Sequence, residues 1–118
     1  MNIMRAIFAT FALLLGTSLN LATADDWKAL AKDHGVELAY QATGNLARLQ
    51  FTNTSKQPMT VNWKLQVLLG TGTKVDNEGE LTIDAGETEI VASAPYRDAG
   101  HPAAVKGVSG TIAAKKTP

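Results

Sequence analysis

The sequence predicts an all-β protein, a small antiparallel sandwich of about six to seven strands preceded by a signal peptide and a short helix. The main observation is residues 59–69, where apolar side chains occupy the odd positions and Thr, Asn, Lys and Gln the even positions 60–66. This period of two is that of a strand with one buried face. Similar short runs recur with turn residues roughly every 8 to 15 positions, a spacing that favours two packed sheets. Trp63 lies mid-run, so we expect this strand to be the centre of the core.

The first 24 residues have the features of a signal peptide. Arg5 supplies a positive charge, residues 6–15 are uncharged and mostly apolar, and Ala22-Thr23-Ala24 has the small-x-small pattern of a cleavage site. The apolar run is shorter than the roughly 20 residues that a membrane span needs. We expect cleavage after Ala24 and a single domain over 25–118, periplasmic or secreted, with no membrane insertion afterwards. An uncleaved N-terminal anchor is the alternative.

The composition excludes several classes of function. Eleven basic residues are matched by eleven acidic ones, so there is no positive surplus for nucleic acid. The sequence has no Cys, which excludes thiol catalysis, thiolate metal sites and disulfides. We expect no cofactor, and a stability that rests on a modest apolar core.

Residues 25–34 are expected to form a short helix. An aspartate can cap its start, and Gly35 suits its C-terminal end. Trp27, Leu30 and Ala31 fall at helical spacing and would form an apolar stripe that docks on the sheets. Trp27 would then cover one end of the core or, alternatively, offer an aromatic platform to a ligand.

Two strands are expected between this helix and the central run. Residues 36–42 alternate Val, Leu, Tyr and Ala with other side chains, and residues 47–52 alternate Ala, Leu and Phe with Arg, Gln and Thr. Thr43-Gly44-Asn45 between them has turn chemistry. The following loop ends at Pro58, which lacks the N–H that strand pairing needs. These strands form either a hairpin or a corner that changes sheets.

Three further strands are expected at 80–84, 88–94 and 105–114. Breaks and turns are expected at 70–73, 84–87 and 95–102, and a flexible tail at 115–118. Residues 74–79 are polar and acidic apart from Val75, which indicates a solvated hairpin tip. The last strand is rich in Gly and Ala, so as a sheet edge it is weakly specified and open to exchange with a partner strand.

Three motifs resemble bacterial immunoglobulin-like or fibronectin-like sandwich domains. They are residues 49–55 (LQFTNTS), Pro58 with residues 61–63 (VNW), and residues 81–87 (LTIDAGE). In such domains an FTNTS strand end leads to a Trp-bearing strand, and an AGE turn joins two later strands. The resemblance covers residues 36–94 and implies an architecture. The inter-sheet Cys pair of antibody-type domains is missing, and a shared sandwich does not transmit function.

A polar face is the first candidate binding site. The central strand would turn Thr60, Asn62, Lys64 and Gln66 outward, with Arg48, Gln50 and Thr52 of a neighbouring strand beside them. Such a hydrogen-bonding surface suits a polysaccharide or a protein of the cell envelope. An ordinary solvated sheet face has the same pattern.

A metal site is the alternative candidate. Its possible ligands are His34, Asp76, Glu78, Glu80, Asp98 and His101. The three central acids sit at alternate positions, which in an extended segment points their carboxylates the same way, as in calcium loops. The two histidines are far apart in sequence and lack the spacing of transition-metal sites.

We expect no enzymatic activity. Ser93 or Ser109 would need His101 and Asp98 as partners, and neither serine lies in a complete Gly-x-Ser-x-Gly elbow. The sequence therefore predicts an exported, non-catalytic binding or accessory module of the bacterial envelope. The alternatives are a periplasmic metal-handling protein and a structural subunit of an envelope complex.

Overall fold

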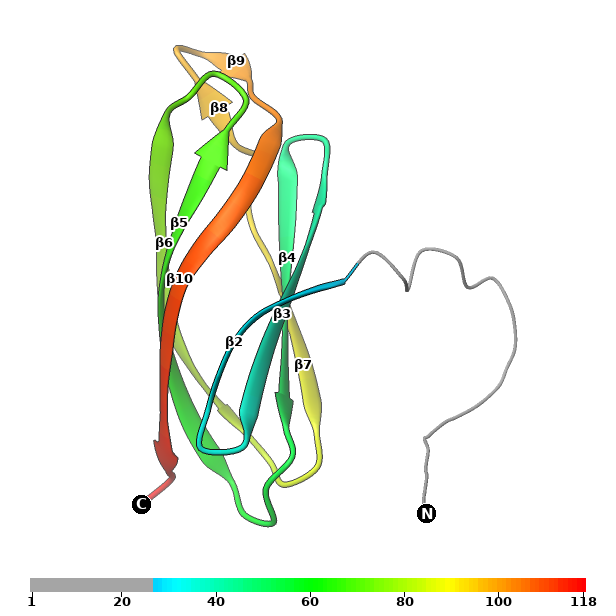
Figure 1. Cartoon of the computed structure of the whole chain (residues 1–118), viewed down its shortest axis with the longest axis vertical. Helices are drawn as coiled ribbons and strands as arrows, with labels where there is room; N and C mark the ends of the chain where they lie inside the picture. Colours follow the sequence, from blue (N-terminus) through cyan, green and yellow to red (C-terminus); the bar gives the residue numbers. More distant parts are fainter. Residues whose placement is uncertain (1–26) are drawn as a thin grey trace, which may run out of the picture.

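A computed structural model describes residues 27–118, and the expected signal peptide lies outside them (Figure 1). The described chain is all-β, with antiparallel pairing throughout and no helix in residues 27–118. The strands are β2 (Lys28–Asp33), β3 (Val36–Thr43), β4 (Leu46–Asn53), β5 (Met59–Leu69), β6 (Lys74–Ile83), β7 (Thr88–Ala92), β8 (Arg97–Asp98), β9 (His101–Pro102) and β10 (Val105–Lys116).

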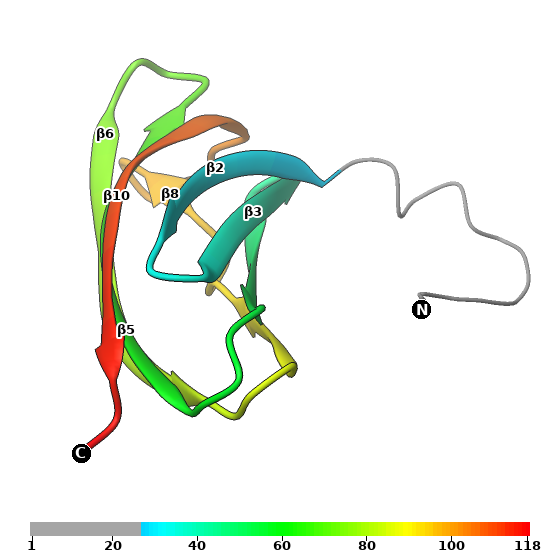
Figure 2. The same ribbon diagram turned by 60° about the horizontal axis from the view of Figure 1, so that its bottom comes forward.

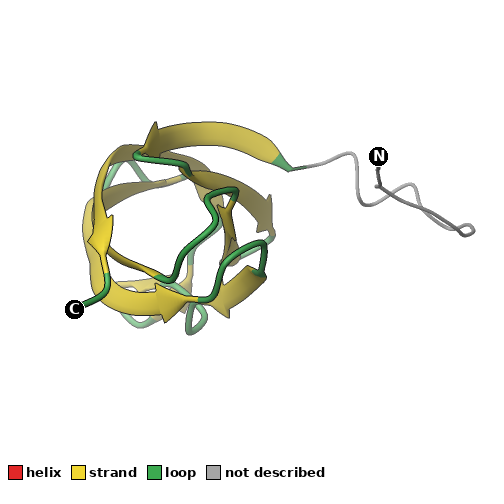
Figure 3. Cartoon of the chain, turned by 90° about the horizontal axis from the view of Figure 1, so that it is seen from below, coloured by secondary structure: helices red, strands yellow, loops and turns green. Residues whose placement is uncertain are grey.

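Two main sheets enclose the core. One has the order β10-β5-β6 and the other the order β2-β3-β4-β7, and the short pair β8-β9 stands at one end (Figures 1 and 2). The chain changes sheets between β4 and β5, between β6 and β7, and a third time between β7 and β10, by way of β8 and β9. Seen end-on, the strands of both sheets surround the core (Figure 3).

Strand β5 has the bounds and the facing that the sequence predicts. Its odd positions are all buried, and the inward side chains of β3, β4 and β6 meet them in one apolar cluster. Val36, Phe51, Val61, Leu69 and Ile83 are fully buried members of this cluster. Because β5 is the middle strand of its sheet, both of its edges are paired, by β10 and by β6.

Trp63 is buried, as predicted, and links the two sheets. Its ring lies 4.8 Å from that of Phe51 on β4, centroid to centroid. Its indole Nε1 donates to Asn77 Oδ1 at 3.0 Å, and Asn77 Nδ2 donates to the Tyr96 hydroxyl at 3.0 Å. Gly79 lies opposite Trp63 in the β5–β6 register and leaves the space that the indole fills.

The side chain of Asn53 joins two of the three sequence motifs, residues 49–55 and residues 81–87. Its fully buried amide donates to the carbonyls of Gln57, Ile83 and Asp84 at 2.8 to 3.2 Å. Its side-chain oxygen accepts from the Ser55 N–H and hydroxyl. The FTNTS segment is thus bonded to the turn that follows β6, and a buried polar group is satisfied.

The predicted helix at 25–34 is wrong over Lys28–Asp33, which form β2; residues 25 and 26 lie outside the described chain. The deciding feature is the turn at His34-Gly35, where both residues have positive φ (47° and 85°). A two-residue hairpin loop of type I′ needs this geometry, so Gly35 reverses the chain and does not end a helix. Pairing with β3 then satisfies the backbone of a segment too short to be a stable helix alone.

The predicted acidic hairpin tip at 74–79 is also wrong, because these residues begin the ten-residue strand β6. Alternation continues through the polar stretch, with Val75, Asn77 and Gly79 half-buried. The register with β5 fixes this extended conformation along its whole length.

The last strand is longer than predicted. It continues to Lys116, so half of the expected flexible tail is strand. The backbone N–H of Thr117 donates to the Pro58 carbonyl at 3.1 Å. Within the expected loop 95–102, β8 and β9 form a small hairpin around Ala99-Gly100, both at positive φ.

Candidate functional site

The polar row of β5 lies on the outer face of the three-stranded sheet, as predicted. Asn62, Lys64 and Gln66 are exposed. Thr60 is buried instead, because its hydroxyl exchanges hydrogen bonds with those of Thr82 at 3.2 Å and Thr117 at 2.9 Å. Three of the four predicted residues are therefore available to a partner.

The acidic residues of β6 run beside this row. Asp76, Glu78 and Glu80 pair in register with Gln66, Lys64 and Asn62. Alternate residues of a strand are about 7 Å apart, so these carboxylates form a line and do not converge on one point. Within residues 27–118 there is no group of three His, Cys, Asp or Glu side chains that could hold a metal ion.

Arg48 and Gln50 do not lie beside the β5 row, and this prediction is wrong. They belong to β4, which pairs with β3 and β7 in the four-stranded sheet. The chain changes sheets in the loop before β5, the corner that the sequence left open as an alternative to a hairpin. The predicted single polar face is therefore split between the outer faces of two sheets.

Gln50 lines a groove on the outer face of the four-stranded sheet. The groove has a volume of about 410 Å³ and an open mouth. Its lining residues are Ala29, Leu30, Ala31, Lys32, Glu37, Leu38, Ala39, Gln50 and Thr52. Ala29 and Ala39 pair in register, and their small side chains form the floor of the groove.

Apolar side chains extend this groove across the sheet. Ile90 pairs with Gln50 and is 52% exposed, and Leu46 on the same face is 41% exposed. These two are the only large hydrophobic side chains of residues 27–118 that are exposed. Their occurrence on one face marks it as the more apolar of the two sheet surfaces.

Arg48 is held along one side of this face. Its Nε and a terminal nitrogen donate to Gln41 Oε1 at 3.1 and 2.6 Å, and its guanidinium lies 5.8 Å from the centre of the Trp27 ring. The cation–π contact and the hydrogen bonds fix a long side chain in one place. Trp27 thus packs on the outer face of the sheet, and the expectation that it covers an end of the core is not met.

The residues of the metal alternative are dispersed. His34 lies in the β2–β3 turn and His101 in β9, at opposite ends of the molecule (Figure 1). Asp98 pairs with His101 across the small hairpin, but its Oδ2 accepts from the hydroxyls of Thr71 at 2.5 Å and Thr73 at 2.7 Å. These hydrogen bonds, with that of Thr71 the larger cause, lower the pKa of Asp98 below its ordinary value of 3.8. The carboxylate fastens the β5–β6 loop to the hairpin.

Ser93 and Ser109, the two candidate nucleophiles, lie at separate places in the fold. Ser93 Oγ accepts from the backbone N–H of Ala47 at 3.0 Å, a structural bond between β4 and the segment after β7. Ser109 lies on β10 opposite Gln66.

The sequence analysis did not predict the groove on the four-stranded sheet, because part of its floor comes from β2, which was expected to be helical.

Comparison with protein-family models, with curated proteins and with solved structures finds no match for this chain. In the part of the chain that the structure describes, no helix has the length and apolar character needed to cross a bilayer.

Proposed function

We propose that this chain is an exported, non-catalytic binding or accessory module of the bacterial cell envelope, and that it binds a protein through the outer face of the four-stranded sheet. The observation that carries the proposal is the coincidence, on this face, of a groove and both exposed large hydrophobic side chains. Export is inferred from the signal-peptide pattern of residues 1–24.

We further propose that the sandwich is immunoglobulin-like. The support is the pairing of β4 with β7 and of β5 with β10, in which the chain crosses three times between the two main sheets. A buried Trp on a central strand, packed against the opposite sheet, is a second feature of immunoglobulin-like domains. In this chain Phe51 on β4 and Trp63 on β5 contact each other between the two sheets.

The chemistry of the face suits a protein partner better than a polysaccharide. Ile90, Leu46 and the Ala29–Ala39 floor offer aliphatic contact that suits the apolar side chains of a protein. Lys32 and Glu37, paired across β2 and β3, put one charge of each sign at the border. An apolar centre with a mixed polar rim is the usual anatomy of a protein–protein interface.

The size of the face indicates a weak or transient complex. Four strands about 4.8 Å apart, each contributing five to eight residues of about 3.4 Å, cover roughly 300 to 500 Å². A stable interface buries about 800 Å² on each partner. The face alone is therefore adequate for an accessory contact that forms and dissociates.

Site-specific photo-crosslinking in the bacterial envelope tests the proposal. A photoreactive amino acid at position 90 should yield one defined cross-linked protein, and the same residue at position 66 on the other sheet should not. Leu46→Glu should abolish the cross-link from position 90, because it places a charge in the apolar part of the face. The matched control is Gln66→Glu, which adds the same charge on the opposite sheet.

The identified partner is then purified and its affinity measured for both glutamate variants. Loss of binding with Leu46→Glu and unchanged binding with Gln66→Glu support the proposal. Cross-links from position 66 alone would move the site to the β5 row. Binding to isolated envelope polysaccharide and to no protein would reject the assigned class of partner.

A further inference from the structure

A second groove lies at the end of the molecule where the chain terminates, away from the face described above. It has a volume of about 440 Å³ and is bordered by the β2–β3 turn, the β4–β5 loop and the end of β10. Three segments far apart in sequence therefore meet around it. Both of its buried lining residues are apolar: Met59, 4% exposed, and Ala114, 6% exposed, form its floor.

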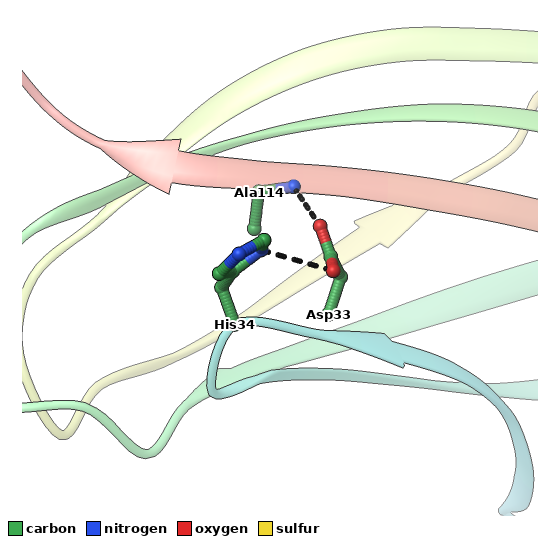
Figure 4. A network of polar contacts seen from close by, with 3 residues as sticks. All are labelled: Asp33, His34 and Ala114. Carbon is green, nitrogen blue, oxygen red and sulfur yellow. Dashed lines mark hydrogen bonds and ion pairs between the residues drawn. The ribbon is translucent and has the colours of Figure 1, made fainter.

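Hydrogen bonds fix these walls in place. Asp33 Oδ2 accepts from the backbone N–H of Ala114 at 2.8 Å, which fastens the β2–β3 turn to β10 (Figure 4). The carbonyl of Gly35 accepts from the N–H and the hydroxyl of Thr54, both at 2.8 Å, which fastens the same turn to the β4–β5 loop. The groove is thus formed before any ligand arrives, which reduces the entropy lost on binding.

The ionisable side chains that line the groove are all basic. They are His34, Lys115 and Lys116. Asp33, which adjoins His34 in sequence, is not part of the lining, and both of its oxygens are already engaged, one by Ala114 and the other by His34 Nδ1 at 2.9 Å (Figure 4). These contacts, with the Ala114 N–H the larger cause, also lower the pKa of Asp33. Its charge is committed to holding the wall and orienting the imidazole.

From this arrangement we propose that the groove binds a small amphiphilic carboxylate, an anionic head with a short alkyl chain. Lys116 receives the head, and the chain lies over Met59 and Ala114. Lys115 pairs with Thr60 and points to the other face of β10. Lys116 pairs in register with Met59, so a basic group and the apolar floor are adjacent on the same pair of strands. A charged rim beside a largely apolar floor matches a ligand that has both characters.

Titration of the purified protein with octanoate, followed by two-dimensional NMR, tests the proposal. Backbone signals of residues 34, 59 and 114–116 should shift together and saturate. The Lys115→Gln and Lys116→Gln double variant should bind about tenfold more weakly, because it loses the charged donor on the groove side of β10. The matched control is Lys28→Gln with Lys106→Gln, which removes two charges outside the groove and should leave the affinity unchanged.

Two further probes separate the contributions of head and chain. Octanol lacks the charge and acetate lacks the chain, and each should bind at least about tenfold more weakly than octanoate. The proposal is overturned if octanoate shifts no signals at the groove, if octanol binds as tightly as octanoate, or if both double variants lose affinity equally. None of the substituted lysines lines the groove on the four-stranded sheet. A negative result with octanoate therefore does not count against the proposed protein contact.

Discussion

Gly79→Ala should destabilise the protein, because the added methyl group would overlap the indole of Trp63. A Cβ at this position would lie 2.3, 2.6 and 2.9 Å from three atoms of that ring. Ordinary carbon contacts are about 3.5 to 4 Å, so the ring must move by more than about 1 Å. It is held by the tilted ring contact with Phe51 and by the hydrogen bond to Asn77.

The expected loss of unfolding free energy is about 2 to 3 kcal/mol. Overpacking a core costs about 1 to 3 kcal/mol and a broken hydrogen bond about 1 kcal/mol. The better strand propensity of Ala returns roughly 0.5 kcal/mol. Urea denaturation with linear extrapolation measures the change. The control is Gly107→Ala on β10, where a Cβ would meet nothing within 4 Å, and its effect should stay within about 0.5 kcal/mol.

A double-mutant cycle with Trp63→Phe isolates the contact. The smaller ring removes the atoms that the methyl group would strike, so Gly79→Ala should cost about 1 to 2 kcal/mol less in that background. Equal costs in both backgrounds, or a neutral Gly79→Ala in the natural sequence, would refute the proposed packing of the indole over Gly79.

Three further predictions concern the loops and the last strand. Asn53→Asp should cost about 3 kcal/mol or more in urea denaturation, because a carboxylate cannot donate to the three carbonyls that the buried amide satisfies; an unchanged midpoint contradicts this role. Gly110→Ala should weaken β10 pairing, since its φ is 140° and a Cβ would lie 2.3 Å from the Lys64 carbonyl oxygen, and faster amide exchange in β10 would report it. The pKa values of Asp33 and Asp98 are lowered on folding, so both contribute stability above the ordinary value of 3.8 that is lost as the pH falls through their folded pKa values. Substituting Asn at both positions should flatten the acid limb of the stability–pH curve measured by thermal unfolding, and an unchanged limb contradicts this assignment.

The central strand was predictable because its pattern is long and unambiguous. Apolar and polar residues alternate without interruption over nine positions, 59–67, and no other period fits them. Phe51 and Leu49 on β4 were equally clear, since their polar neighbours are outward on an exposed face. In these stretches local pattern and tertiary packing point to the same structure.

The first strand was not predictable because its local pattern fits two structures. Trp27, Leu30 and Ala31 fall at helical spacing in the sequence, while in the structure β2 contains a bulge between Ala29 and Ala31. Bulges shift the facing of later residues by one, which removes the alternation that identifies a strand. Gly35 adds to the ambiguity, since helix ends and type I′ turns both favour Gly at positive φ.

The candidate sites depended on pairing that no local pattern contains. Gln50 and Arg48 were identified as outward-facing, but their sheet and neighbours follow from the crossover at residues 54–58. The exposure of Ile90 follows from the place of β7 at a sheet edge. The groove of His34, Lys115 and Lys116 required knowing which strand ends meet.

The core between the two sheets is built around Trp63. Acrylamide quenching of its fluorescence in a Trp27→Phe variant, which leaves Trp63 as the only tryptophan, tests this claim most directly. We predict a blue-shifted emission that resists quenching under native conditions and becomes accessible only in the urea transition. A native emission at the wavelength of a solvated indole, quenched as readily as in the unfolded protein, would contradict it.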